Sequence, residues 1–200
     1  MFSMDGLSTF LPESEITALK ALAESLKHFA SDKTAATLYY PGGGLDLMRP
    51  LAILDSIHKS AKNWRIVLQD PAESIEPIVG LAQAITGVIP HKISGKDWSS
   101  KSASFHFKDR DITIDLSRSD ALHQLPPNLD SYDIYFDRAF EIVRIKDESF
   151  VARIARGLRS GGVAITDCGF KEPTDLERVD TKSTPWGFYK SPAVYRKRKD

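Results

Sequence analysis

The sequence predicts an α/β fold in which a mainly parallel sheet carries helices on both faces. Short apolar segments alternate along the chain with segments of helical periodicity, which is the pattern of consecutive strand–helix–strand units. Residues 63–70 have a near-continuous apolar centre, as expected of a parallel strand buried on both faces. The 200 residues, 42% hydrophobic and 27% charged, suit one globular domain with a sizeable core.

The first expected element is a helix that packs an apolar stripe against the rest of the domain. Apolar residues recur at helical spacing from Ile16 to about Ala30. Ser14 is the expected N-terminal cap of this helix, because a serine hydroxyl can accept a hydrogen bond from a free backbone N–H of the first turn.

The same patterns predict the remaining elements. Strands are expected at 34–40, 63–70, 132–136 and 163–166, a hairpin at 103–107 and 111–116, and helices at 47–62, 75–85 and 147–158. Gly161 and Gly162 are expected to stop the last helix. Prolines among the last residues favour short antiparallel or irregular edge strands. We therefore expect one domain over 1–200, with a helical extension at 1–33, a core at 34–170 and C-terminal edge strands at 171–200.

Charge and cysteine content narrow the classes of function. Lys and Arg balance Asp and Glu at 27 each, so no overall field favours nucleic acid or an anionic membrane. The basic run at 196–199 is expected to be a solvated tail. Cys168 is the only cysteine, which fits a reducing, cytoplasmic compartment. No apolar run approaches the roughly 20 residues of a membrane span, and the histidines lack metal-ligand spacing.

Residues 37–46, Thr-Leu-Tyr-Tyr-Pro-Gly-Gly-Gly-Leu-Asp, form the most informative segment. A strand-forming run ends in three glycines, and a helical pattern follows. This is the layout of a strand, a tight turn and a helix whose N-terminus faces a ligand. Glycine permits the sharp turn and lets a ligand approach without a Cβ in the way. We predict a ligand loop here, and a tight turn without a ligand is the alternative.

Acidic residues follow several of the predicted strands. Asp70, Asp120, Asp137 and Asp167 each come just after an apolar run. Right-handed crossovers bring the carboxyl ends of parallel strands to one edge, where ligands bind in such sheets. A turn role competes with ligand binding for Asp70, and Asp120 could instead cap a short helix at 121–125.

The order of these segments resembles that of the class I, Rossmann-like methyltransferases that use S-adenosylmethionine, over residues 34–170. Residues 40–46 stand where that family has its acidic-x-Gly-x-Gly-x-Gly loop. Ser-Asp-Ala-Leu at 119–122 resembles its Asp-Ala element, and residues 158–166 resemble its loop and fifth strand. The resemblance implies a Rossmann-like three-layer sandwich with S-adenosylmethionine as the cofactor.

The resemblance also implies roles for individual residues. Asp70 would hold the ribose hydroxyls and Asp120 the adenine amino group, since a carboxylate accepts hydrogen bonds from a diol or an amine. The glycine turn would lie against the methionine part of the cofactor. The predicted cofactor-binding residues are Tyr40, Pro41, Gly42, Gly43, Gly44, Asp46, Asp70, Asp120 and Asp137.

Two residues of the loop depart from the family pattern. Tyr40 replaces its leading acid, and Asp46 replaces its third glycine. Asp46 could take over the role of the acid or could cap the following helix. Asp137-Arg138 stands where amino-methylating nucleic-acid enzymes have Asn/Asp-Pro-Pro-aromatic, so that subclass is not expected. The pair is predicted to be a surface or structural ion pair.

No catalytic base stands out in the sequence. Methyl transfer to a reactive acceptor needs mostly positioning, and a base is required only when the acceptor must lose a proton. His123 is near the predicted edge but is expected to be an exposed loop residue, and Cys168 a small buried one.

The function that we predict is S-adenosylmethionine binding by a methyltransferase-like protein that acts on a small-molecule or protein acceptor. The main alternative is a non-catalytic module that keeps the fold and binds a partner. A different nucleotide-type ligand in the same cleft is a third hypothesis. The acceptor and the oligomeric state are left open by the sequence.

Overall fold

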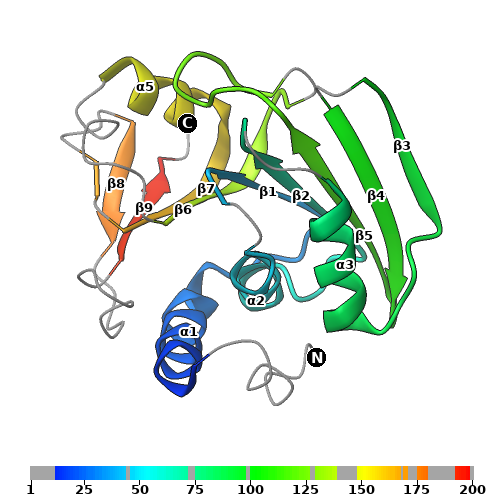
Figure 1. Ribbon diagram of the computed structural model, residues 1–200. Helices are drawn as coiled ribbons and strands as arrows, with labels where there is room; N and C mark the ends of the chain where they lie inside the picture. The colour runs from blue at the N-terminus through cyan, green and yellow to red at the C-terminus, as the bar shows by residue number, and fades with distance from the viewer. Residues whose placement is uncertain are drawn as a thin grey trace.

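The computed structural model describes residues 12–43, 46–71, 75–97, 100–126, 129–138, 148–167, 169–170, 175–179 and 192–198. Within them, one sheet is flanked by helices (Figure 1). The helices are α1 (Glu13–Leu26), the short 3₁₀ helix η2 (Lys27–Phe29), α2 (Met48–Ile57), α3 (Ile75–Thr86) and α5 (Glu148–Gly157). The strands are β1 (Ala35–Pro41), β2 (Asn63–Gln69), β3 (Lys92–Asp97), β4 (Ser100–Phe107), β5 (Arg110–Ser117), β6 (Tyr132–Asp137), β7 (Leu158–Thr166), β8 (Leu176–Val179) and β9 (Ala193–Lys197).

The sheet has a parallel centre and antiparallel edges. Among the described residues, its strand order is β3-β4-β5-β2-β1-β6-β7-β9-β8. Strands β5, β2, β1, β6 and β7 run parallel. β4 and β3 extend one side as antiparallel strands, and β9 and β8 extend the other. The predicted α/β class and the antiparallel C-terminal edge are confirmed, although the sheet is more mixed than expected.

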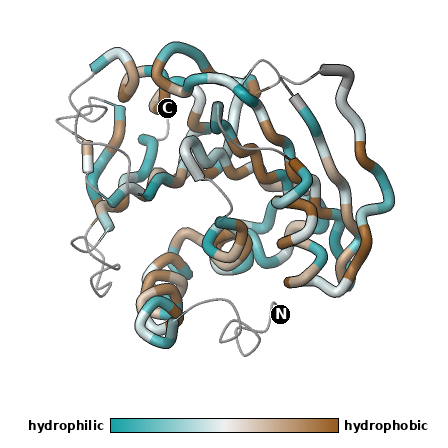
Figure 2. Tube along the Cα trace, viewed as in Figure 1, coloured by the Kyte–Doolittle hydropathy of each residue, from teal (hydrophilic) through white to brown (hydrophobic). Residues whose placement is uncertain are grey.

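Helices cover both faces of the sheet (Figure 1). α1, α2 and α3 pack on one face, and α5 packs on the other, with a separate hydrophobic cluster on each side. The alternation along β1 shows the division, because Leu38 and Tyr40 belong to the α2 side and Tyr39 to the α5 side. Hydrophobic segments accordingly run through the central strands and along α1 and α2 (Figure 2).

Two predicted helix boundaries on the α2 side were wrong. α1 begins at Glu13 behind Pro12 with no side-chain cap, so Ser14 lies inside the first turn and cannot be the capping residue. α2 ends at Ile57, because His58 leaves the helical conformation with φ −123° and the chain turns into β2. No described helix is long and apolar enough to cross a membrane.

The predicted glycine stop after the last helix was also wrong. α5 ends at Gly157, and β7 begins at once with Leu158, so Gly161 and Gly162 lie inside a strand. A Cβ at Gly157 would come within 2.7 Å of the Tyr132 ring. This close approach of the ring, a tertiary contact, explains why a glycine stands at the end of the helix.

Strand β3 was not predicted. Its sequence, Lys-Ile-Ser-Gly-Lys-Asp, lacks clear alternation, and Gly95 adopts φ +147°, which favours glycine. The strand forms by antiparallel pairing with β4, and the register between the two strands shifts between Ser94 and Asp97.

Two glycines provide a matched test of this packing. A Cβ at Gly162 would lie 2.8 Å from the carbonyl oxygens of Arg159 and Asp133, whereas one at Gly80 would meet nothing within 4 Å. We expect Gly162→Ala to lower the free energy of unfolding by about 2 kcal/mol. Gly80→Ala, on an exposed helical position, should raise it by about 0.5–1 kcal/mol. Urea unfolding would measure both, and equal effects would contradict the described β6–β7 contact.

Candidate functional site

Residues predicted to bind a ligand are brought to one edge of the sheet. The register pairs Gln69, the last residue of β2, with Pro41 of β1 and Ser117 of β5. Asp137, the last residue of β6, pairs with Thr166 of β7. The parallel strands therefore end together, and the segments that follow β1, β2 and β5 emerge from the same carboxyl edge.

Backbone hydrogen bonds join the glycine turn to its neighbours. Gly42 donates its N–H to the carbonyl of Gln69 at 2.8 Å, and Asp70 donates its N–H to the carbonyl of Ser117 at 3.0 Å. Gly42 adopts φ +63°, a left-handed conformation that favours glycine. The turn, Asp70 and the start of the loop that carries Asp120 are thus held side by side.

Tyr40 explains the second glycine of the run. Its ring is buried against Phe136, with ring centroids 4.5 Å apart. A Cβ at Gly43 would lie 2.7 Å from a Tyr40 ring carbon, so a side chain at this position is excluded by packing. The side chain that replaces the expected acid therefore points into the core. Gly44 lies outside the described residues.

Asp46 makes contacts with the start of α2 and with Tyr40. Its Oδ2 accepts hydrogen bonds from the Tyr40 hydroxyl at 3.2 Å and from Arg49 Nη1 at 2.9 Å, and its Oδ1 accepts from the Arg49 backbone N–H at 3.3 Å. The last bond satisfies a backbone N–H in the first turn of α2, whose N-terminal cap is Leu47, and a carboxylate at this end of a helix is favoured. Burial, together with the Asp46 charge, raises the pKa of Tyr40 well above its usual value, so the phenol remains a donor.

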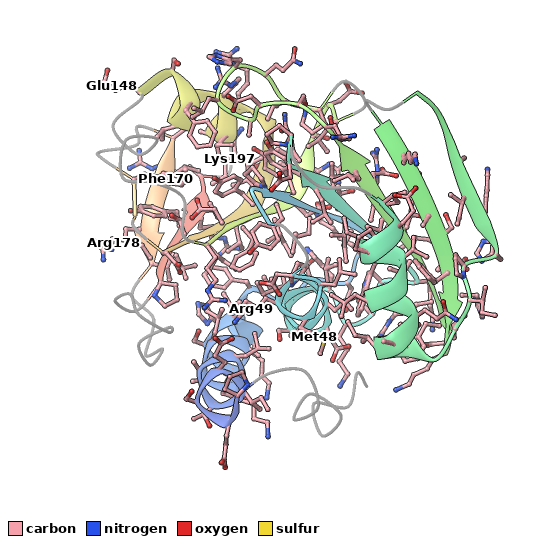
Figure 3. The ribbon with its side chains drawn as sticks, in the orientation of Figure 1. Met48, Arg49, Glu148, Phe170, Arg178 and Lys197 are labelled. Carbon is pink, nitrogen blue, oxygen red and sulfur yellow. The ribbon has the colours of Figure 1, made fainter. Side chains whose placement is uncertain are left out.

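Arg49 extends this network to α1. Its side chain is only 5% exposed and also donates to Glu15, which lies in the first turn of α1. Glu15 accepts a further bond from Arg138, just after β6, at 3.5 Å. Figure 3 shows Arg49 at the start of α2, beside α1. The network joins the glycine turn, both helices and the end of β6, and the sequence analysis did not find it. The feature of the sequence that could have indicated this network is Arg49 itself, an arginine at the start of an otherwise apolar helix.

Gln69 is a second positioning residue that the sequence analysis missed. It is 1% exposed. Its Oε1 accepts from the Tyr39 hydroxyl at 2.5 Å, and its Nε2 donates to Ser119 Oγ at 2.8 Å and to the Gln124 carbonyl at 3.0 Å. These bonds hold the loop after β5 across the end of β2, with Asp120 inside the segment that they enclose.

Asp120 forms a turn instead of capping a helix. Its Oδ1 accepts the Leu122 N–H at 2.8 Å, and its carbonyl accepts N–H groups from His123 and Gln124. Residues 121–123 are in a turn conformation, so the short helix considered for this segment does not form. The Asp120 side chain is 43% exposed and that of His123 82% exposed. His123 is therefore an exposed loop residue, as expected.

A cavity of about 210 Å³ adjoins this loop. Its walls include Ser117 and Pro126, at the two ends of the loop, and Arg65 and Asp115 on the sheet face. Arg65 and Asp115 form an ion pair of 2.6 Å. The cavity provides polar space next to the segment that carries Asp120.

Asp137 is buried, so of the two roles predicted for its pairing with Arg138, a surface or a structural ion pair, the surface role is excluded. The residue is 3% exposed, and its Oδ1 has no hydrogen-bond partner among the described residues. Burial raises the pKa of Asp137 to about 7, while the neighbouring hydroxyls of Tyr135 and Thr166 act against the rise and the charge of Asp167 adds to it. The end of β6 thus carries a carboxyl group that ionises near neutral pH.

Cys168, predicted to be a small buried residue, lies outside the described residues. Tyr195 of β9 is buried, and its hydroxyl accepts the Phe170 N–H at 2.8 Å. In the described part of the chain, no three His, Cys, Asp or Glu side chains gather as a metal site would require.

No model of a known protein family matches the sequence, and no curated protein matches it. Among solved structures, a Listeria monocytogenes protein assigned to the class I S-adenosylmethionine-dependent methyltransferases aligns with a TM-score of 0.51 at 10% identity, over 98% of this chain and 65% of that one. This chain therefore spans less than two thirds of that protein.

Two other solved structures align at lower TM-scores. One is a 16S rRNA (adenine(1408)-N(1))-methyltransferase from Catenulisporales acidiphilia with bound cosubstrate (TM-score 0.46, 11% identity, 90% of both chains). The other is a phosphoethanolamine N-methyltransferase from Haemonchus contortus (TM-score 0.41, 21% identity, 73% of this chain and 27% of that one). At such identities structural similarity bears on the fold alone, and the fold of this chain is similar to that of the Listeria protein.

Replacing Arg49 tests the network below the turn. We expect Arg49→Met to lower the free energy of unfolding by about 3 kcal/mol, because it removes the cation that pairs with Asp46, which is 15% exposed, and one of the two that pair with Glu15, which is 25% exposed. Arg178→Met, at an exposed position of β8, is the matched control and should change it by less than about 0.5 kcal/mol. Chemical unfolding measures both, and a silent Arg49 variant would contradict the described ion pairs.

The pH dependence of stability tests the buried carboxyl of Asp137. Its raised pKa means that the folded state holds this proton from about pH 4 to about pH 7, whereas the unfolded state loses it near pH 4. The free energy of unfolding should therefore fall as pH rises through this window, by up to about 1.4 kcal/mol per unit. Asp137→Asn should remove this slope and be the more stable protein at pH 8. Parallel slopes for the two proteins would rule out the raised pKa.

Proposed function

We propose that this protein binds S-adenosylmethionine at the carboxyl edge of its sheet and is a methyltransferase-like protein. The observation that carries the proposal is the placement of the glycine turn beside Asp70, with backbone bonds linking β1 to β2 and β2 to β5. In a sheet of this kind, ligands bind outside the carboxyl ends of the parallel strands. The fold of a class I methyltransferase supports the choice of ligand.

The residues at this edge fit most of the cofactor. Asp70 follows β2 and would accept hydrogen bonds from the ribose hydroxyls. Asp120, about half exposed in a loop that Gln69 holds down, would accept from the adenine amino group. The cavity beside that loop leaves room for part of the ligand.

The methionine part of the cofactor would be bound by other groups than in the family pattern. Asp46 is engaged by Arg49 and Tyr40, so its role would be to hold the turn in place. The backbone of Pro41, Gly42, Gly43 and Gly44 would then receive the amino-acid part of the cofactor.

Asp137 adds one acceptor at the end of β6. Its Oδ1 is buried and lacks a described partner, and a donor from a bound ligand would satisfy it. When bound, S-adenosylmethionine supplies a sulfonium methyl group for transfer to a nucleophile. The acceptor that this chain would methylate, a small molecule or a protein side chain, is to be found by turnover assays with acceptor panels.

Calorimetric titration with S-adenosylmethionine and S-adenosylhomocysteine tests the proposal. We expect micromolar-range binding to the unmodified protein, and Asp70→Ala should weaken it about tenfold or more, because hydrogen bonds to a charged group are lost. Asp109→Ala is the matched control, since Asp109 lies in the exposed turn between β4 and β5 and pairs with Lys62. It should leave binding unchanged.

The absence of heat and of a thermal shift at about 1 mM ligand would refute cofactor binding. The alternatives would then be a non-catalytic module that binds a partner or a site for a different nucleotide-type ligand.

A further inference from the structure

A second cavity lies at the opposite, amino-terminal edge of the parallel strands. Its volume is about 270 Å³, and its walls come from the segment between α1 and β1, the end of α2, the start of β7 and strand β9. The residues that matter for its chemistry are Phe29, Ser31, Lys33, His58, Ser160 and Arg196. Strand β1, with seven residues, separates this cavity from the glycine turn by about 20 Å.

The first cationic group of the cavity is Lys33. Its Nζ lies 2.5 Å from Asp133 Oδ1, and Asp133 also accepts from Arg159 Nη1 at 2.7 Å and from the Thr37 N–H at 2.8 Å. Asp133 is 1% exposed and is the one described carboxylate in contact with both cations. Two positive charges therefore share one negative charge, and the group as a whole remains positive.

The second cationic group is Arg196. Its guanidinium lies 5.7 Å from the centroid of the Phe29 ring, a cation–π contact that holds the side chain at the cavity wall. Glu177 stands opposite Arg196 in the β8–β9 register. No ion pair joins Arg196 to Glu177 or to any other residue in the described part of the chain. Its charge is therefore not neutralised by a direct contact there.

Neutral polar groups and apolar walls complete the cavity. Ser31 Oγ and His58 Nδ1 are 3.2 Å apart. Burial and the positive charge of Lys33 lower the pKa of His58, while Asp133 acts in the opposite direction, so the ring is neutral at pH 7. Phe29, Ile57 and Val163 provide apolar surface.

We propose that this cavity binds a small organic anion, with a phosphate or carboxylate head between Lys33 and Arg196 and a compact apolar body against Phe29 and Ile57. Two cations, Lys33 and Arg196, line the same cavity, which favours an anion, and the apolar wall favours a molecule larger than an inorganic ion. The limited volume excludes a folded partner or a polymer segment. The site shares no residue with the carboxyl edge.

Binding of three small probes tests this proposal. Phenyl phosphate and benzoate each carry an anionic head on an apolar ring, and benzyl alcohol is a neutral molecule of similar size. We expect the two anions to bind with millimolar or tighter affinity by calorimetry and benzyl alcohol to bind at least about tenfold more weakly. Equal binding of all three, or no binding of the anions at about 10 mM, would overturn the proposal.

Matched charge variants locate the site. Arg196→Gln should weaken phenyl phosphate binding about tenfold or more. Arg198→Gln makes the same change two residues further on, at an exposed residue that does not line the cavity, and should leave the affinity unchanged. Lys33→Gln provides a second test, in which Arg159 still balances Asp133. Equal affinities across these variants would contradict the assignment.

Two further measurements separate this site from the carboxyl edge. An anion beside His58 should raise the pKa of that histidine, which an NMR titration of its ring protons detects with and without phenyl phosphate. Asp70→Ala, which would weaken cofactor binding, should leave phenyl phosphate binding intact. An unchanged His58 titration, or loss of phenyl phosphate binding in Asp70→Ala, would refute a separate site.

Discussion

Burial of β1 on both faces is the constraint on which the rest of the structure depends. Tyr39 packs toward α5, whereas Leu38 and Tyr40 pack toward α2, and all three are at most 2% exposed. A strand in this position must satisfy all its backbone hydrogen bonds from both sides, and β2 and β6 provide them. Helices must also cover both faces, because each face is apolar. The ends of β1 are therefore the places where polar groups can gather.

The polar network below the glycine turn compensates for the burial of a tyrosine side chain, that of Tyr40, beneath the turn. Tyr40 occupies core volume, and its hydroxyl must find a partner because it is buried. Asp46 provides that partner, and the buried Arg49 balances the charge of Asp46 and reaches Glu15 on α1. The turn is consequently supported by contacts within the chain, and Gly42 and Gly43 are explained by backbone conformation and by the Tyr40 ring. A ligand at this turn would meet mainly backbone.

The two edges of the parallel sheet differ in charge. The carboxyl edge carries the acids Asp70, Asp120 and Asp137, which suit hydroxyl and amine groups of a ligand. The amino edge carries Lys33 and Arg196 around a cavity, which suits an anion. The network of Arg49 and Glu15 ties α1 to the carboxyl edge, while η2, which directly follows α1, contributes to the amino-edge cavity. The same helical layer thus contacts both proposed sites.

The sequence by itself determined the α/β class, the order of strands β1, β2, β4, β5, β6 and β7 along the chain and the position of the glycine turn. These depend on local hydrophobic periodicity and on the conformational freedom of glycine, which short segments encode. Only the tertiary structure decided that α5 ends where the Tyr132 ring meets Gly157, that Asp137 is buried, and that Arg49 joins α1 to the turn. Such contacts join residues far apart in the chain, and their energies depend on burial and partner geometry, which a linear pattern does not contain.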